Sequence, residues 1–133
     1  MISFLDPKSV HHPGPAYSHS AVVPAGTELV FLSGQVGARP DGSASASIAD
    51  QAEQVFANIS AVLAAYGLDA SSLVKLTTFL VAGQDIQAVR AARSGFLGGH
   101  RPTSTLVYVS QLADPAWLVE VEAIAARSAG QGR

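Results

Sequence analysis

The segment that most constrains the fold of this chain is the apolar run at residues 118–125 (LVEVEAIA). Side chains of a strand alternate between its two faces, so Val119 and Val121 share one face while Glu120 and Glu122 share the other. Burying a carboxylate without a partner costs several kcal/mol in effective terms. The two glutamates must therefore be solvated, ion-paired or functional, and the rest of the chain has to decide which.

The composition indicates one domain over residues 1–133. It also indicates more apolar side-chain surface than the core of one small domain can bury. Hydrophobic residues make up 48% of the chain and charged residues only 14%. No apolar run approaches the ~20 residues that cross a bilayer, so we expect no membrane partner. An obligate oligomer interface resembles a domain core cut in half, which makes other copies of the chain a destination for the excess apolar surface.

Charge and cysteine content exclude several functional classes. The formal net charge is -2 and the eight Lys and Arg residues are scattered, so we expect no nucleic-acid partner. The absence of cysteine excludes disulfides, thiolate catalysis and cysteine metal sites. The N-terminal residues show neither a basic region nor an adequate apolar region for a secretory signal, and we expect a cytoplasmic protein.

Periodicity predicts the elements of an α+β fold. Apolar residues recur at helical spacing over 48–66, with Ser47 as N-cap and Gly67 as C-terminal stop, and a second helix is expected over about 85–97. Strands are predicted, each from a short apolar or alternating segment, at 28–33, 73–80, 103–109 and 118–125. Both helices are expected on one face of the sheet. Because the strands look apolar on both sides, other copies of the chain are expected to cover the opposite face.

Six short segments, in this order, resemble those of the RidA/YjgF family, also called the reactive intermediate deaminase or L-PSP endoribonuclease family: YSHS (17–20), LSGQVG (32–37), YGL (66–68), VKLTTF (74–79), RPTST (101–105) and VEVEAIA (119–125). The resemblance spans nearly the whole chain. It implies a chorismate-mutase-like α+β fold, assembled as a homotrimer whose sheets line a central β-barrel, with ligand clefts between subunits.

The resemblance also implies an activity. Deaminating members hydrolyse enamine or imine intermediates, such as 2-aminoacrylate, to 2-keto acids and ammonia without a metal or an organic cofactor. Glu120 falls on the family's glutamate, which places water, and Tyr17 on its tyrosine. Gly34 falls on the glycine whose backbone lines the cleft, and Ser33 and Thr105 are expected to bind ligand beside it.

The arginine that pairs with the substrate carboxylate in the family's deaminases does not carry over. It stands two positions after the conserved proline, where this chain has Ser104 after Pro102. A serine cannot form the charge-assisted fork, and losing such an anchor costs roughly 2 to 5 kcal/mol. Arg101 would point to the opposite face of the strand, so it cannot replace the missing arginine. Arg90 on the second helix is the candidate replacement. The alternative is that Arg90 is a solvated helix residue without a role in the cleft.

Three functions stay open from the sequence. The first is a RidA-like trimer that binds a small metabolite in intersubunit clefts and acts as a non-standard enamine or imine deaminase or a related hydrolase. The second is a non-catalytic trimer that binds a metabolite or stabilises partner proteins. The third, a ribonuclease, lacks a basic groove and a catalytic histidine pair. We expect no metal, since the four histidines show no ligand spacing, and we assign Glu122 a structural role.

Overall fold

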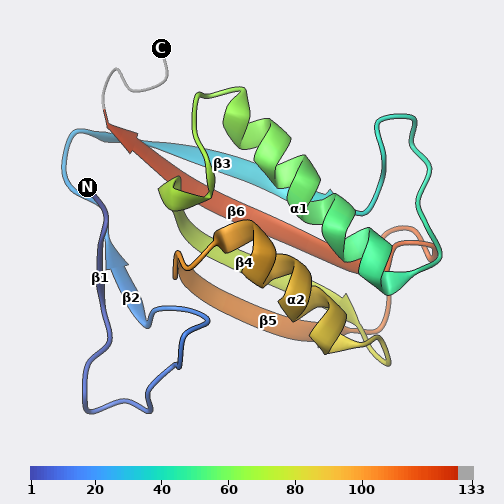
Figure 1. The fold of residues 1–133 in the computed structure, drawn as a ribbon, viewed down its shortest axis with the longest axis horizontal. Helices are drawn as coiled ribbons and strands as arrows, with labels where there is room; N and C mark the ends of the chain where they lie inside the picture. Colours follow the sequence, from blue (N-terminus) through green and yellow to red (C-terminus); the bar gives the residue numbers. More distant parts are fainter. Residues whose placement is uncertain (129–133) are drawn as a thin grey trace.

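The computed structural model describes residues 1–128 and combines a four-stranded sheet, two helices and a separate two-stranded ribbon (Figure 1). The sheet has the strand order β3-β6-β4-β5, in which β4 and β5 run parallel and the other neighbours antiparallel. The elements in chain order are β1 (Ser3–Leu5), β2 (Ser20–Val22), β3 (Thr27–Val36), α1 (Ile48–Ala64), the short 3-10 helix η1 (Ala70–Ser72), β4 (Leu73–Val81), α2 (Ile86–Leu97), β5 (Thr103–Val109) and β6 (Val119–Ser128).

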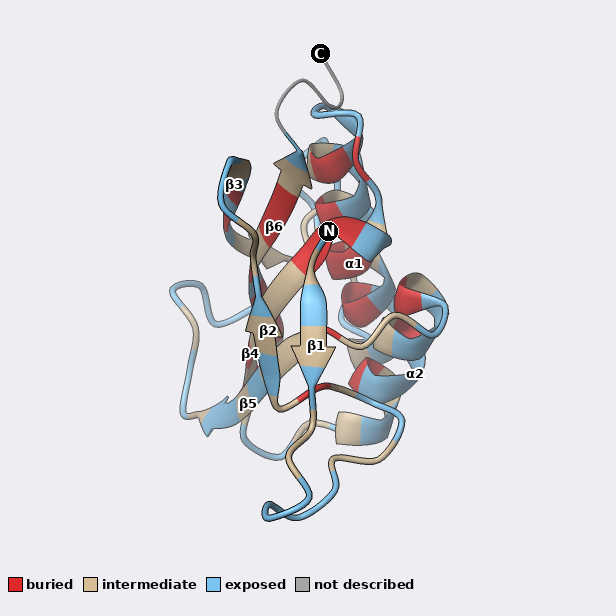
Figure 2. Ribbon diagram, turned by 90° about the vertical axis from the view of Figure 1, so that its left-hand side faces the viewer, coloured by how far each residue is buried: buried red, intermediate tan, exposed pale blue. Residues whose placement is uncertain are grey.

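Both helices lie on the same face of the sheet, as the sequence predicted (Figure 2). Their caps explain where they begin and end. The Ser47 hydroxyl accepts the N–H of Asp50, and at the other end of α1 Gly67 adopts a left-handed conformation with φ of 70°. The Leu68 N–H then returns to the carbonyl of Leu63, which closes a Schellman-type end. The second helix starts at Asp85 as N-cap and stops at Gly98, whose φ is 56°.

Strand β3 is longer than the predicted 28–33 and contains an irregularity. The register moves from Leu32 opposite Ala123 to Gln35 opposite Val121, so that two residues of β3, Ser33 and Gly34, face a single residue of β6. The sequence suggested that the strand ends at this glycine, but the strand instead bulges there and continues to Val36. The ribbon β1-β2 was also not predicted, because its three-residue strands are too short to show a period.

The core lies between the helices and one face of the sheet. Alternation in β6 is as predicted, with Val119 and Val121 fully buried beneath the helices and the glutamates on the other face. Helix α1 contributes Val55, Ile59 and Leu63, none of which has exposed surface. Burying a side chain of this size stabilises the fold by about 1.5–3 kcal/mol.

Gln51 ties helix α1 to the loop that precedes β6. Its side-chain amide donates to the carbonyl oxygens of Ser45 and Ala116, at 2.7 and 2.8 Å, and its oxygen accepts the N–H of Leu118 at 2.9 Å. The helix also approaches the end of β3 closely, since a Cβ at Gly37 would lie 2.8 Å from the Cα of Gln51. The fully buried Gln51 therefore fixes the entry of the chain into β6.

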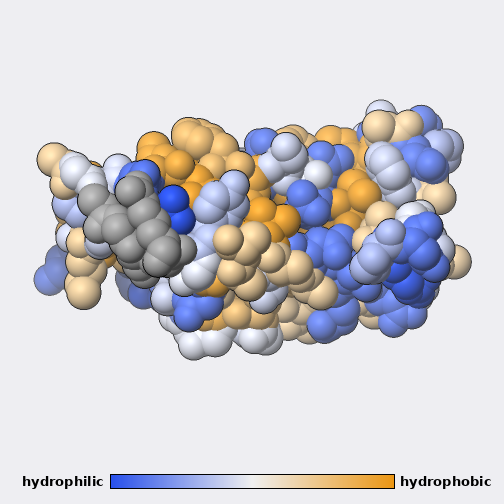
Figure 3. Space-filling view, turned by 90° about the horizontal axis from the view of Figure 1, so that it is seen from above, coloured by the Kyte–Doolittle hydropathy of each residue, from blue (hydrophilic) through white to orange (hydrophobic). Residues whose placement is uncertain are grey.

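The sheet face opposite the helices is uncovered and partly apolar. Phe31 is 70% exposed and Leu29 is 48% exposed on β3, and Val107 is 41% exposed on β5. Figure 3 views the molecule from above Figure 1, and so along the sheet rather than onto this face, and it shows apolar patches among polar ones on that side of the surface. Within residues 1–128, no helix is long and apolar enough to cross a membrane.

Replacing Gln51 by leucine is expected to lower the free energy of unfolding by about 3 kcal/mol, because a buried polar group left without a partner costs roughly 1–3 kcal/mol. Chemical denaturation of the two proteins measures the difference. Glu53→Leu, at an exposed position of the same helix, is the matched control and should change the value by less than about 0.5 kcal/mol. Equal stability of Gln51→Leu and the parent protein would contradict the structural role of Gln51.

Candidate functional site

The predicted site residues fall into two groups on opposite faces of the sheet. Ser104 pairs with Leu76 of β4 and shares its helix-covered face, whereas Glu120 pairs with Phe79 and lies on the open face. Tyr17 and Arg90 line the same cavity as Ser104. One copy of the chain therefore does not bring Glu120 and Tyr17 together.

The open-face group is built on the bulge of β3. The Glu120 carboxylate lies directly over Gly34, and a Cβ at that position would overlap the carboxylate oxygen Oε2. Glycine at the bulge is therefore what allows the carboxylate its present position. Ser33, the other bulge residue, is exposed and its carbonyl accepts the side-chain N–H of Gln35.

The second group lines a cavity of about 530 Å³ between α2, the start of β5 and the segment around Tyr17. Its polar groups are the phenol of Tyr17, the hydroxyls of Thr78 and Ser104, and the guanidinium groups of Arg90 and Arg93. Apolar side chains of α2 and β5 complete the lining. The volume suits a small ligand rather than a macromolecule.

Arg93 is a cavity-lining residue that was not among the predicted site residues. Its Nη1 donates to the Ser104 hydroxyl at 3.2 Å, so the cavity holds a guanidinium beside the very serine that the family resemblance marks as replacing an arginine. Arg93 follows the buried Val89 by one helical turn, and this i, i+4 spacing was the available signal that it borders the covered face. Arg90 is exposed and makes no hydrogen bond with any of residues 1–128.

Burial lowers the pKa of the Arg93 guanidinium, and the neighbouring positive charge of Arg90 lowers this pKa further. Both causes disfavour the charged form, and no carboxylate of residues 1–128 lies within 4 Å of either side chain. An arginine stays protonated even so, because its pKa in water is above 12. The cavity is therefore electropositive.

Arg101 does not enter the cavity, in agreement with its exclusion on strand geometry. Its Nη2 pairs with the Asp6 carboxylate at 2.8 Å and also donates to the Tyr17 carbonyl at 2.8 Å. The other Asp6 oxygen accepts the His19 N–H at 2.8 Å. Arg101 and Asp6 thus hold the segment around Tyr17 against the start of β5, where Ser18 bridges to Thr103.

The pKa of the Asp6 carboxyl group reflects these contacts. The hydrogen bond from the His19 backbone and, after it, the bond and charge of Arg101 lower the pKa of Asp6 below its ordinary 3.8. A carboxyl group whose pKa is lower in the folded than in the unfolded state stabilises the fold above about pH 3.8, and this stabilisation is lost as the pH falls through the lowered pKa.

Thr105 lies on the open face, apart from Ser104. Its hydroxyl accepts from Lys75 Nζ at 3.4 Å across the parallel pair β4-β5. Glu122 is exposed on the same face, opposite Thr77, and makes no hydrogen bond or ion pair within residues 1–128. Its structural role stays a prediction.

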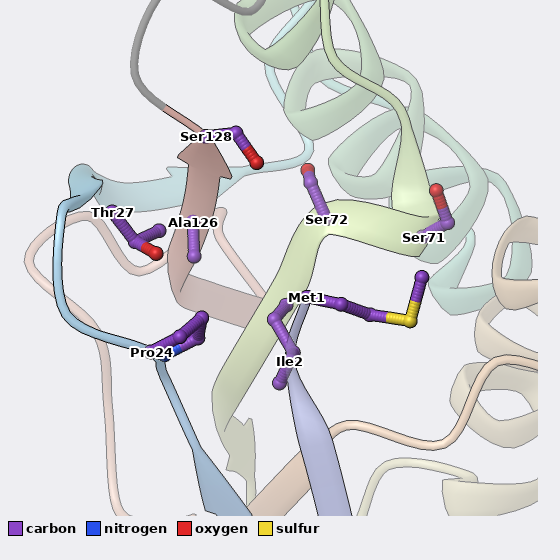
Figure 4. Close-up of a pocket in the computed structure, with 8 residues that line it drawn as sticks. All are labelled: Met1, Ile2, Pro24, Thr27, Ser71, Ser72, Ala126 and Ser128. Atoms are coloured by element: carbon purple, nitrogen blue, oxygen red, sulfur yellow. The ribbon is translucent and has the colours of Figure 1, made fainter.

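Another cavity, of about 630 Å³, lies elsewhere, at the end where β3 and β6 meet the N-terminus (Figure 4). Its lining contains small hydroxyl side chains and apolar groups, including Met1, Ile2 and Ser72, but no charged side chain and none of the predicted site residues. The rings of His12, His19 and His100 each bond to a backbone group, as in His100 Nε2 to the Leu73 carbonyl at 2.8 Å. Within residues 1–128, no three His, Asp or Glu side chains gather in a way that could hold a metal ion.

Comparison with known proteins identifies the family. The family described as endoribonuclease L-PSP matches residues 9–127. The chain belongs to the RidA/YjgF/L-PSP family. TdcF of Escherichia coli strain K12, for which a reactive intermediate deaminase activity is proposed, is 34% identical over 76% of this chain and 81% of its own length.

Two further relatives extend the comparison of this RidA-family protein. A 2-iminobutanoate/2-iminopropanoate deaminase of Dermatophagoides farinae is 33% identical over 84% of this chain and 88% of its own. The crystal structure of YyfB from Yersinia pestis, a Rid protein of unknown function, superposes with a TM-score of 0.85 at 26% identity, covering 95% of this chain and 98% of the other. The predicted family and the α+β fold are therefore confirmed.

Replacing Asp6 by asparagine is expected to loosen the segment around Tyr17 in this RidA-family protein, because the variant keeps an acceptor for His19 but loses the ion pair with Arg101. Hydrogen exchange of the Ser18 and His19 amides should be faster in Asp6→Asn than in the parent protein at pH 7. The difference should shrink only as the pH falls through the lowered pKa of Asp6, below its ordinary 3.8, because the parent carboxyl is protonated there. A rate difference that persists unchanged into acid would contradict the role given to the charge.

Proposed function

We propose that this protein hydrolyses a small enamine or imine to a carbonyl compound and ammonia, in clefts between the subunits of a homotrimer. The observation that carries the proposal is the Glu120 carboxylate seated over Gly34 at the bulge of β3. Two relatives support the proposal: the Dermatophagoides farinae protein is named as a deaminase, and a deaminase activity is proposed for TdcF.

The need for a second subunit follows from the two faces. Tyr17 and the Ser104 cavity lie beside the edge strand β5, while Glu120 and Ser33 lie on the open face, so a complete site requires the open face of one copy to meet the β5 edge of another. The exposed Phe31 and Leu29 on that open face supply apolar area for such a contact. The trimer and its central barrel are expected from the family, whose members are trimers.

In the proposed reaction, a water molecule beside Glu120 adds to the imine carbon while the carboxylate accepts its proton. The carboxyl group then passes this proton to the nitrogen, which gives a carbinolamine. In the second half of the reaction the carboxylate takes the proton of the new hydroxyl group and gives it to the amino nitrogen, so that the carbon–nitrogen bond breaks and ammonia leaves as the carbonyl forms. General base catalysis of this kind contributes about 10²- to 10⁴-fold to a rate. Tyr17 orients the ligand from the neighbouring subunit, and Ser33, Gly34, Ser104 and Thr105 border it.

A second candidate function is binding of the metabolite without turnover. It is supported by the family resemblance of the sequence, in which Ser104 stands at the position of the arginine of the deaminating members. Under this reading a ligand raises the melting temperature but is recovered unchanged.

Glu120→Gln is expected to reduce the rate of imine hydrolysis by at least about 100-fold, because the amide cannot accept the proton from water. An amino-acid oxidase can generate imino acids in the assay, and the release of ammonia and keto acid follows the reaction. Glu122→Gln, two residues along the same face, is the matched control and should retain the parent rate. Parent activity in Glu120→Gln would overturn its catalytic role, and no acceleration by the parent protein would favour binding without turnover.

Phe31→Asp is expected to convert the trimer to monomers, since a carboxylate at this position loses its hydration when a second copy covers the open face. Sedimentation velocity measures the oligomeric state. Ala61→Asp, on an exposed position of α1, is the control and should remain trimeric. A Phe31→Asp protein that sediments as a trimer would place the subunit contact elsewhere.

A further inference from the structure

Helix α2 presents a pair of arginines to one cavity with nothing in the described chain to neutralise them. Arg90 and Arg93 are one turn apart, and both line the 530 Å³ cavity and an adjoining cavity of about 250 Å³ that reaches to His100. The ion pairs within residues 1–128 are Arg101 with Asp6 and Arg127 with Glu28, and neither touches α2.

The hydrogen bonds of Arg93 leave most of its donors available. A guanidinium has five N–H groups, and the one bond of Arg93 within residues 1–128 goes to the Ser104 hydroxyl. No side-chain nitrogen of this region is both buried and without a partner, so the remaining donors of Arg93 reach open space. Ser104 thus accepts one hydrogen bond from Nη1 of Arg93, and the other N–H groups of this guanidinium can bind a ligand.

The positive charges of Arg90 and Arg93 repel each other. Burial of Arg93 and the proximity of Arg90 both lower the pKa of Arg93, which means that these surroundings disfavour the protonated pair. An anion between the two side chains would remove that penalty. A single carboxylate neutralises one guanidinium, whereas a ligand with two carboxylates neutralises both and matches their planar forks.

We propose that Arg93, positioned by Ser104, and Arg90 form a double anion-binding site that selects small dicarboxylic ligands. The proposal deepens the function above, since under that function the substrate is a dicarboxylic 2-imino acid. Arg93 binds the carboxylate next to the reacting carbon, beside Tyr17. Arg90, closer to solvent, binds the distal carboxylate, and the apolar floor formed by Val89 and Leu106 contacts the carbon chain between them.

The test uses binding of stable 2-keto acids to the full-length protein by titration calorimetry. The dicarboxylic probe is 2-oxoglutarate, the monocarboxylic probe is 2-oxobutanoate, and inorganic phosphate distinguishes a general preference for dianions. The parent protein should bind 2-oxoglutarate at least about tenfold more tightly than either other probe, which corresponds to one charge-assisted hydrogen-bonded group.

Variants assign the two roles. Arg93→Gln should weaken both keto acids by roughly ten- to a hundredfold, while Arg90→Gln should weaken 2-oxoglutarate alone and bring it to the level of 2-oxobutanoate. Arg39→Gln, which alters an exposed arginine bonded to Ser43, is the charge-matched control and should bind as the parent does. The double variant Arg93→Ser with Ser104→Arg, which moves the guanidinium from the helix to the strand of the same cavity, should recover part of the affinity.

Equal affinity of the parent protein for all three probes would overturn the proposal, as would unchanged binding in Arg93→Gln. If Arg93→Gln instead dissociates the trimer in sedimentation, the arginine serves a subunit contact and the proposal is wrong. Selective binding of 2-oxoglutarate together with an inactive deaminase assay would refute the proposed function while sustaining the double anion site, so the two can fail separately.

Discussion

The structure depends on strand β6, which lies inside the sheet and is paired on both sides. Its neighbours β3 and β4 hydrogen-bond to its backbone on both edges. The side chains on its two faces can therefore have different roles. One face is buried without exposed surface beneath helices α1 and α2, and that burial fixes the register. Because a slip by one residue would put glutamates into the core, the alternation in β6 also fixes where Glu120 stands.

The bulge in β3 is the local adjustment that turns this strand pair into a candidate site. Two residues, Ser33 and Gly34, oppose one residue of β6, and the missing side chain at Gly34 is what accommodates the Glu120 carboxylate. A regular strand would place a side chain there. The same pairing therefore stabilises the fold and leaves the partly buried Glu120 carboxylate on a face that is otherwise partly apolar.

The other part of the candidate site lies at the β5 edge of the sheet. Arg101 and Asp6 clamp the segment around Tyr17 to the start of β5, and α2 adds its arginines above Ser104. The clamp uses polar bonds from the N-terminal segment, whose strands are too short to recognise from the sequence. Fold and proposed chemistry are thus separated within one copy, and assembly of several copies is what would join them.

Much of the fold follows from local patterns in the sequence. The helices were predicted within a few residues because their caps, Ser47 and Gly98, and their apolar stripes are local signals, and 103–109 was predicted to the residue. The β3 bulge was not predicted, since a glycine in a strand signals an end as readily as an irregularity. The sequence by itself determined the family, the two faces of β6 and the carboxylates on one of them, because alternation is a property of neighbouring residues. Only the tertiary structure decided that Arg93 reaches Ser104 and that Glu120 and Tyr17 lie on opposite faces, because these facts depend on how separate elements cross in space.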